Sequence, residues 1–276
     1  MKKINFVFFG TPEVASDTLE ILKEHGFLPS LIITSPDAPK GRGLLMQVSP
    51  VTIFAEKNNI PCLKPEKLEN IFTSLPQVDL FIVVAYGKII PENILIIPNF
   101  GSINIHYSLL PKYRGASPVE SAILNGDIYT GVTIQKMVYK MDAGNIIAQE
   151  KIEILPEERT SDLRKRLIKI GGELLVKTLP DFMEGKIKEI AQNENEATHC
   201  KKIKKEDGLI DLEGNATENY NKFRAYATWP RTFFFKNGKR IIIIDAELKD
   251  GKFTIKKILP EGKKEIQYEN SIYEKK

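Results

Sequence analysis

The stretch Ile4–Glu24, INFVFFGTPEVASDTLEILKE, is the clearest indication of the fold class. Its first residues, Ile4–Phe9, form a continuous apolar run, which is typical of a strand covered on both faces. Thr11-Pro12-Glu13 comes next, with a Thr suited to the N-cap of a helix and a Pro suited to the first helical position. A strand that passes directly into a helix predicts a parallel sheet with helices on both sides.

The same alternation continues over the first two thirds of the chain. Apolar runs predict further strands at Leu31–Thr34, Leu80–Ala85, Ile103–Ile105, Thr133–Val138 and Asn145–Ile152. Helical spacing of apolar residues predicts helices at Val51–Lys57 and Ser161–Met183. Ser35–Pro50 contains two Pro before its end and two Gly, and is predicted to be a long loop.

The last third has a different pattern. Lys186–Lys205 is polar and of mixed charge, which predicts a linker. Short apolar strands separated by an Asn-Gly and an Asp-Gly turn follow, at Thr232–Phe235, Arg240–Ile244 and Phe253–Ile258. We therefore expect a second, small all-β module after the α/β domain.

Composition narrows the class of protein. The 276 residues are 42% hydrophobic, enough for a substantial core, and no apolar run approaches the roughly 20 residues that span a bilayer. Cys62 and Cys200 show no local pairing pattern and suit a reducing cytoplasm. The net charge of +4 has its basic excess in the C-terminal third, which permits an anionic partner.

A second stretch, residues 101–144, carries the candidate chemistry: GSINIHYSLLPKYRGASPVESAILNGDIYTGVTIQKMVYKMDAG. Asn104 and His106 are two residues apart on a predicted strand, and so share one face. Asp142 follows a second predicted strand, in a Met-Asp-Ala-Gly turn. An amide or an imidazole N–H can stabilise an oxyanion, and a carboxylate beside an imidazole can move protons directly or through water. These residue types can transfer an acyl group to an amine.

Each of these residues also has an ordinary structural explanation, because Asn and Asp are common in turns and a single His is often structural. Their order, with the Ser108–Pro111 loop between them, is what favours catalysis. Other chemistries lack support, since the sequence has no metal-ligand spacing, no Gly-x-Ser-x-Gly and no Gly-x-Gly-x-x-Gly. We expect no metal.

The motifs in this stretch resemble those of the folate-dependent formyltransferases. They are Asn104-x-His106, the Ser-Leu-Leu-Pro loop at Ser108–Pro111, Arg114 to Pro118, and Asp142 to Gly144. Further segments resemble the branch of that family that acts on charged tRNA, namely Phe8–Glu13, Ser35–Val51, Val83–Pro91, Ala197–Asp207 and Arg224–Pro230. The resemblance therefore covers nearly the whole chain.

The resemblance implies a Rossmann-like catalytic domain at residues 1–185, a linker at 186–205 and an OB-like β-barrel at 206–276. Few residues follow Pro230, so we expect that barrel to be shorter than usual for the family. It also implies a cytoplasmic monomer that uses 10-formyltetrahydrofolate as donor and the methionine amine of initiator tRNA as acceptor, with no membrane partner.

The resemblance also assigns residues to the site. Catalysis is expected from Asn104, His106 and Asp142. Folate is expected to bind backbone groups of Val83, Val84, Ala85, Tyr86, Ser108, Leu109, Leu110 and Pro111. Arg42, in the long loop, is expected to reach the tRNA acceptor stem, where a guanidinium suits a phosphate or a base edge.

Two alternatives remain at this point. A sugar-nucleotide N-formyltransferase would use the same donor and the same three residues, without needing Arg42 or a basic C-terminal module. A nucleic-acid-binding module on an inactive Rossmann-like fold would have no need to keep Asn104, His106 and Asp142 together.

Overall fold

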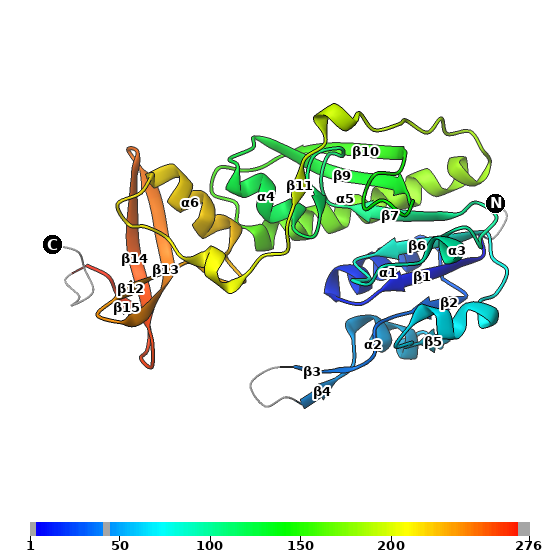
Figure 1. Ribbon diagram of the computed structural model, residues 1–276, viewed down its shortest axis with the longest axis horizontal. Coiled ribbons are helices and arrows are strands. Elements are labelled where there is room, and N and C mark those ends of the chain that lie inside the picture. Colours follow the sequence, from blue (N-terminus) through cyan, green and yellow to red (C-terminus); the bar gives the residue numbers. More distant parts are fainter. Residues whose placement is uncertain (1–3, 41–44, 270–276) are drawn as a thin grey trace. The chain divides into compact units, whose positions relative to one another are not determined.

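The computed structural model describes residues 4–40 and 45–269 (Figure 1). Its contacts divide the chain into two compact units, each built from segments that are distant in sequence. The first unit comprises Met1–Arg114, Gly131–Lys151 and Arg166–Thr198, and the second Gly115–Thr130, Ile152–Lys165 and His199–Lys276. Each unit is described by itself below.

A seven-stranded sheet with the order β10-β9-β7-β6-β1-β2-β5 organises the first unit (Figure 1). Its strands are β1 (Phe6–Gly10), β2 (Leu31–Ile33), β5 (Cys62–Leu63), β6 (Leu80–Val84), β7 (Ser102–His106), β9 (Tyr129–Lys136) and β10 (Ile146–Glu153). The pairs β1–β2, β1–β6, β2–β5 and β6–β7 are parallel, and β7–β9 is antiparallel. The predicted mostly parallel α/β sheet is thereby confirmed.

The two central strands explain why the sheet forms here. Every residue of β1 and of β6 is buried, as expected for parallel strands covered on both faces. They pair in register from Phe6 opposite Leu80 to Gly10 opposite Val84. Gly10 is needed at the end, because a Cβ there would lie 2.5 Å from the Cβ of Ala15 and 2.9 Å from the carbonyl oxygen of Val84.

The helical segments of the first unit and its borders are α1 (Glu13–Glu24), α2 (Pro50–Lys57), η1 (Leu68–Ser74), α3 (Glu92–Leu95), α5 (Thr160–Met183) and η2 (Glu194–Glu196). The prediction that Thr11 caps α1 is wrong, because Pro12 occupies the N-cap and no side chain caps the helix. The Thr11 hydroxyl lies instead 3.1 Å from the Ser35 hydroxyl and 3.3 Å from the Tyr86 carbonyl oxygen. It therefore links three strand ends.

The predicted long loop at Ser35–Pro50 contains regular structure. Ala38–Lys40 (β3) and Leu45–Gln47 (β4) pair as antiparallel strands. The prediction of a loop without strands is therefore wrong here. Arg42 lies between the two strands and outside the described residues. At the end of the segment, the Ser49 hydroxyl accepts from the Thr52 amide at 3.0 Å and caps α2.

The second unit is built on α4 (Pro118–Leu124), η3 (Lys205–Gly208), α6 (Ala216–Ala225) and a four-stranded sheet. Its strands, in order across the sheet, are β12 (Phe233–Lys236), β13 (Lys239–Lys249), β14 (Lys252–Pro260) and β15 (Ile266–Gln267), all antiparallel. The short strands β8 (Arg114–Gly115) and β11 (His199–Cys200) form a separate pair.

Turn chemistry explains the β12–β13–β14 meander. Asn237 and Gly238 both have positive φ, 52° and 72°, and so do Asp250 and Gly251, at 50° and 72°. Two successive positive-φ residues are what a two-residue hairpin turn of the I′ type needs. The predicted Asn-Gly and Asp-Gly hairpins are thereby confirmed, while closure of this sheet into an OB-like barrel stays a prediction.

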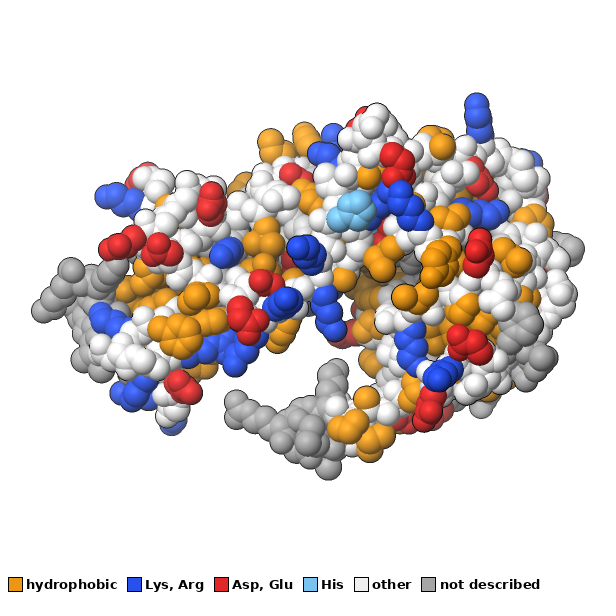
Figure 2. Space-filling model, viewed as in Figure 1, with side chains coloured by type: hydrophobic (Ala, Val, Ile, Leu, Met, Phe, Trp, Pro, Cys, Tyr) orange, Lys and Arg blue, Asp and Glu red, His pale blue; other side chains and the backbone are white. Residues whose placement is uncertain are grey.

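The surface of the second unit mixes hydrophobic and basic side chains over the β12–β15 sheet (Figure 2). Trp229 and Phe235 are each more than half exposed, and Lys236 directly follows Phe235 in sequence. Among all the residues that the structure describes, no helix is both long and apolar enough to cross a membrane.

Candidate active site

Asn104 and His106 lie on β7, where register places them opposite Gln135 and Thr133 of β9. Directly opposed residues of an antiparallel pair share a face, so all four side chains belong to one face of the sheet. On the other side of β7, Asn104 is level with Val83 of the parallel strand β6. The carboxyl ends of β6 and β7 therefore lie side by side, and His106 is the last residue of β7. The carboxyl ends of parallel strands are a usual place for ligand sites in α/β sheets.

The orientation of the His106 ring follows from its contacts. Its side chain is 6% exposed, and Nε2 lies 2.9 Å from the carbonyl oxygen of Tyr113. A carbonyl oxygen can only accept, so Nε2 carries a proton and donates it. The other ring nitrogen, Nδ1, lies 3.7 Å from Oδ2 of Asp142. Nδ1 is thus the nitrogen available on the side of the carboxylate.

Asp142 is presented by a tight turn. Its φ of 51° lies in the left-handed region, which Asp tolerates better than most residues. The Gln135 side chain donates from Nε2 to Asp142 Oδ1 at 2.8 Å, which leaves Oδ2 directed toward His106. Two residues on, Gly144 packs so closely that a Cβ would lie 1.7 Å from the carbonyl oxygen of Lys136. The Asp-x-Gly motif therefore serves the turn as well as the carboxylate.

The Ser108–Pro111 loop leaves β7 directly after this pair and is fastened to β9 and β10. The Thr133 hydroxyl donates to the Ser108 carbonyl oxygen at 2.6 Å and accepts from the Leu110 amide at 3.1 Å. The Gln149 side chain donates to the Leu110 carbonyl oxygen at 2.8 Å and to the Thr133 hydroxyl at 2.9 Å. Leu109 and Pro111 complete the loop, whose backbone is held by hydrogen bonds at both Ser108 and Leu110.

The Val83–Tyr86 segment ends β6 beside β7. Val83 and Val84 are buried strand residues, and the chain turns out of the strand at Ala85, whose φ is 47°. Tyr86 packs its ring edge-on against Phe9, and burial raises the pKa of its hydroxyl to about 12. At Gly87, φ is 79° and a Cβ would meet no atom within 4 Å, so open space borders this turn.

A segment at Glu189–Thr198, inside the predicted linker, reaches this site and was not anticipated from the sequence. Ile190 pairs with Ile146, and Gln192 Nε2 donates to the carbonyl oxygens of Asp142 at 2.9 Å and Gly144 at 2.7 Å. Gln192 Oε1 accepts from Arg114, whose side chain is fully buried. A buried arginine needs an anionic or strongly polar partner, but the sequence does not mark Arg114 as buried, so it gave no signal for Gln192.

Glu194 supplies the charge that Arg114 needs. Its two carboxylate oxygens accept from Arg114 at 2.8 and 3.1 Å, and one also accepts from Lys140 at 2.7 Å. Hydrogen bonds from Arg114 and then Lys140 lower the pKa of Glu194 to about 2. This carboxylate is therefore ionised throughout the physiological range.

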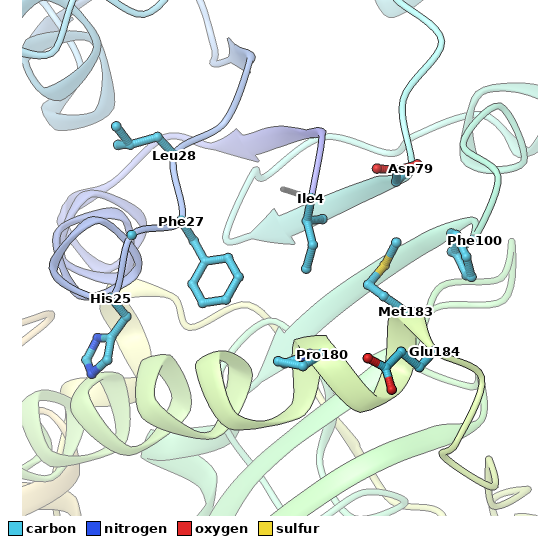
Figure 3. Close-up of a pocket in the computed structure, with 10 residues that line it drawn as sticks. Ile4, His25, Phe27, Leu28, Asp79, Phe100, Pro180, Met183 and Glu184 are labelled. Atoms are coloured by element: carbon cyan, nitrogen blue, oxygen red, sulfur yellow. The ribbon is translucent and has the colours of Figure 1, made fainter. Parts of the chain in front are cut away.

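A separate cavity of about 370 Å³ lies at the amino ends of the parallel strands, opposite to the end where His106 lies. Figure 3 shows Ile4 and Phe27 directed toward Pro180 and Met183 across it. Asp79 of its lining immediately precedes β6, so the cavity borders the amino ends of the parallel strands. None of the residues predicted for catalysis or folate binding lines it. Within the described residues, no cluster of His, Cys, Asp or Glu is arranged to hold a metal ion.

The arrangement near His106 can carry out proton transfer at a bound amine. An imidazole nitrogen and a carboxylate oxygen face each other, and the Asn104 amide belongs to the same sheet face. An amide N–H is a suitable donor to an oxyanion, and the paired Nδ1 and carboxylate are suitable acceptors for a proton. Of the residues predicted for catalysis, His106 and Asp142 face each other, and Asn104 lies on the same face of β7 as His106. Arg42 lies outside the described residues.

Comparison with known proteins gives two family matches. The formyl transferase family matches residues 2–179, and the formyl transferase C-terminal domain family matches residues 202–271. A methionyl-tRNA formyltransferase from Thermotoga neapolitana is 41% identical over 87% of this chain and 78% of its own length. One from Staphylococcus aureus strain Newman is 38% identical over 88% of this chain and 79% of its own length.

Solved structures share the fold at lower identity. The sugar 3N-formyl transferase WlaRD, crystallised in the presence of dTDP and 5-N-formyl-THF, superposes with a TM-score of 0.69 at 24% identity and covers 91% of this chain and 88% of its own. An N-formyltransferase from Helicobacter canadensis, in complex with folinic acid and dTDP-3-aminofucose, gives the same TM-score at 22% identity, with 90% and 88% coverage. The matches to both family domains and the relatives at about 40% identity lead to one conclusion: this chain belongs to the formyl transferase family.

Proposed function

We propose that this chain transfers the formyl group of 10-formyltetrahydrofolate to the free amino group of methionyl-initiator-tRNA, and so supports translation initiation. The observation that carries the proposal is the His106 Nδ1–Asp142 Oδ2 pair at 3.7 Å on the face of β7 that also bears Asn104. The acceptor follows from the relatives at 38% to 41% identity, which are methionyl-tRNA formyltransferases.

In the proposed mechanism, the neutral amine of the acceptor attacks the formyl carbon of the donor. The Asn104 amide stabilises the oxyanion of the tetrahedral intermediate by hydrogen bonding. Asp142 and His106 Nδ1 take the proton from the attacking nitrogen and return a proton to the leaving nitrogen of the folate. The C–N bond to the folate then breaks, leaving a formylated amine and tetrahydrofolate, and no metal or covalent enzyme intermediate is needed.

We assign the folate to backbone groups of Val83–Tyr86 and Ser108–Pro111. The two segments leave adjacent strands at the edge where His106 lies, and Gly87 leaves open space there. The loop at Ser108–Pro111 is held by Thr133 and Gln149, so it offers a preorganised wall. A rigid wall suits a flat heterocycle better than a mobile loop does.

We assign the acceptor tRNA to Arg42 and to the basic C-terminal part of the chain. In this proposal, residues 1–185 carry catalysis, 186–205 link and 206–276 form a short OB-like domain that binds nucleic acid through aromatic and basic side chains. The exposed Trp229 and Phe235 are the side chains suited to stacking. The enzyme acts in the cytoplasm as a monomer, without a membrane partner.

A parallel assay tests this function. The chain is incubated with 10-formyltetrahydrofolate and either charged initiator tRNA or amino-sugar nucleotides, and the formylated product is quantified for each acceptor. We expect formyl-methionyl-tRNA as the main product, and no product with the His106→Ala variant. Formylation of an amino-sugar nucleotide with none of methionyl-tRNA would overturn the proposed acceptor and favour the sugar-nucleotide alternative.

The role of Arg42 has its own test. Arg42→Ala should raise KM for the tRNA far more than KM for the donor, because the proposal assigns Arg42 to the acceptor alone. Arg42→Lys keeps the charge but not the planar fork, so it separates phosphate attraction from bidentate recognition. A defect confined to donor affinity would contradict the assignment.

A further inference from the structure

The segment Glu189–Thr198 contacts, on one side, the Tyr113–Arg114 backbone that holds the His106 ring and, on the other, the Asp142 turn. On one side, Thr198 accepts from the Arg114 amide at 2.8 Å through its carbonyl oxygen and from the Tyr113 amide at 2.9 Å through its hydroxyl. The Tyr113 carbonyl oxygen in turn holds Nε2 of His106. On the other side, Gln192 holds the two carbonyl oxygens of the Asp142 turn. One short segment thus connects the His106 side with the Asp142 side.

The orientation of the Gln192 amide is unambiguous. Arg114 is a donor only, so the atom that faces its Nε and Nη2 at 3.0 and 2.8 Å must be the amide oxygen. Carbonyl oxygens are acceptors only, so the atom that faces Asp142 and Gly144 must be the amide nitrogen, which has two protons for two acceptors. Gln is therefore the side chain that satisfies a buried guanidinium and two carbonyls at once.

The hydrogen bonds of Gln192 bear on the distance between Asp142 Oδ2 and His106 Nδ1, which the proposed proton transfer depends on. Asp142 adopts a left-handed conformation, and such turns persist only when their surroundings hold them. Gln135 fixes the carboxylate itself, whereas Gln192 fixes the backbone from which the carboxylate projects. Glu194 and Lys140 extend the network, since Lys140 begins the same turn and shares Glu194 with Arg114.

We propose that Gln192 is a positioning residue for formyl transfer, which sets the separation of Asp142 from His106 by clamping the Asp142 turn to the buried Arg114. This inference rests on the proposed function and adds to it a residue that touches no reactant. It predicts that loss of the amide donors slows turnover without weakening the binding of either substrate.

The decisive variant is Gln192→Glu. It keeps an oxygen for Arg114, and so keeps the buried guanidinium satisfied, but it turns the donors toward Asp142 and Gly144 into acceptors. We expect kcat to fall about 10- to 100-fold, since a displacement near 1 Å in an active site can cost about 100-fold. KM for donor and tRNA should stay within about threefold of the wild type, as substrate contacts are kept. The matched control is Gln77→Glu, the same substitution at an exposed Gln that donates to Asn99, which should leave kcat unchanged.

Two further measurements test the clamp and its link to the Asp142 carboxylate. In a double-mutant cycle, Gln192→Glu should add little to the loss already caused by Asp142→Asn, because both act through one carboxylate. Hydrogen exchange should accelerate in residues 140–144 of Gln192→Glu and stay unchanged in β1 and β6. The exchange result does not depend on activity, so it tests the clamp even if the wild type formylates neither acceptor.

The outcomes are separable. An inactive wild type would count against the proposed function, whereas an active wild type with full kcat in Gln192→Glu would overturn the positioning role. Additive losses in the cycle, or unchanged exchange at 140–144, would also overturn it.

Discussion

At the scale of single residues, Asp142 and Gly144 meet two different requirements of the candidate site, a carboxylate and a position without a side chain. Asp142 supplies a carboxylate that Gln135 orients toward His106, while Gly144 supplies the absence of a side chain against the Lys136 carbonyl. Both belong to the same turn, so the path of the backbone at Gly144 bears on where the Asp142 carboxylate projects.

Replacing Asp142 with Asn tests the chemical half. The side chain keeps its size but cannot accept a proton, so kcat should fall about 10²- to 10⁴-fold, the usual contribution of a positioned acid–base group. Steady-state kinetics with methionyl-tRNA measures the loss. Asp79→Asn is the matched control, since its carboxylate accepts from the Asn5 amide at 3.0 Å and lines the cavity at the amino ends of the parallel strands. A comparable loss in the control would point to a general effect on folding.

Replacing Gly144 with Ala tests the spatial half. The added Cβ would lie 1.7 Å from the Lys136 carbonyl oxygen, so the turn must move. We expect a fall in kcat of about tenfold or more, because a 1 Å misplacement can cost about 100-fold. Gly185→Ala serves as control for the added methyl group, because a Cβ at Gly185 meets no atom within 4 Å even though its φ is 68°. Equal kcat in the two variants would show that the turn tolerates the shift.

At the scale of elements, the Glu189–Thr198 segment is held by charge as well as by backbone pairing. The pKa of Glu194 is lowered from 4.5 to about 2 by hydrogen bonds from Arg114 and Lys140. A depressed carboxylate pKa contributes stability above the unfolded value, and that stability is lost as pH falls through the folded value. The contribution of Glu194 should thus be complete above about pH 4.5 and gone below about pH 2.

Glu194→Gln makes this prediction measurable. The Tm of the wild type should exceed that of the variant at pH 7, and the difference should shrink between about pH 4.5 and 2. Thermal unfolding followed by circular dichroism over this range gives the comparison. Glu196→Gln is the control, because Glu196 accepts from the neutral amide of Asn193 and so depends less on its charge. A Tm difference that does not vary with pH would contradict the ion-pair explanation.

The N-terminus of α6 provides a test in the second unit. Asn215 Oδ1 accepts from the amides of Thr217 at 2.9 Å and Glu218 at 3.1 Å. Asn215→Ala should lower the free energy of unfolding by about 1 kcal/mol, the usual value of an N-cap. Asn215→Asp should stay close to the wild type in stability, because Asp is also a good N-cap residue. Urea denaturation measures both variants. An Ala variant as stable as the Asp variant would mean that the cap contributes nothing here.

At the scale of the whole molecule, the charge distribution predicts how the acceptor binds. The net charge is +4, and tRNA binding through Lys and Arg releases counterions. KM for the tRNA should therefore rise on the order of tenfold or more between about 50 and about 200 mM salt. KM for the folate should change much less, since its proposed contacts are backbone groups. A KM for the tRNA that does not change with salt concentration would contradict a role of the Lys and Arg side chains in binding the acceptor.

The sequence predicted the central sheet because burial on both faces requires long apolar runs, as at Phe6–Gly10 and Leu80–Val84. It predicted the two hairpin turns because few residues adopt positive φ readily. It did not predict β8, β11 or α3, which span two to four residues and leave no periodic pattern. The hairpin β3–β4 was missed for the same reason.

Asn104, His106 and Asp142 could be proposed from the sequence as candidates because their residue types suit proton transfer, and the structure pairs two of them, His106 and Asp142. Gln192 could not, since nothing in a polar segment marks one amide among many. Its role depends on meeting Arg114 and the Asp142 turn, which are distant in sequence. Hydrophobic periodicity and turn chemistry are local properties, and the sequence by itself determined what depends on them. Long-range polar contacts form only where the folded chain brings donors to acceptors, and the tertiary structure alone decided those.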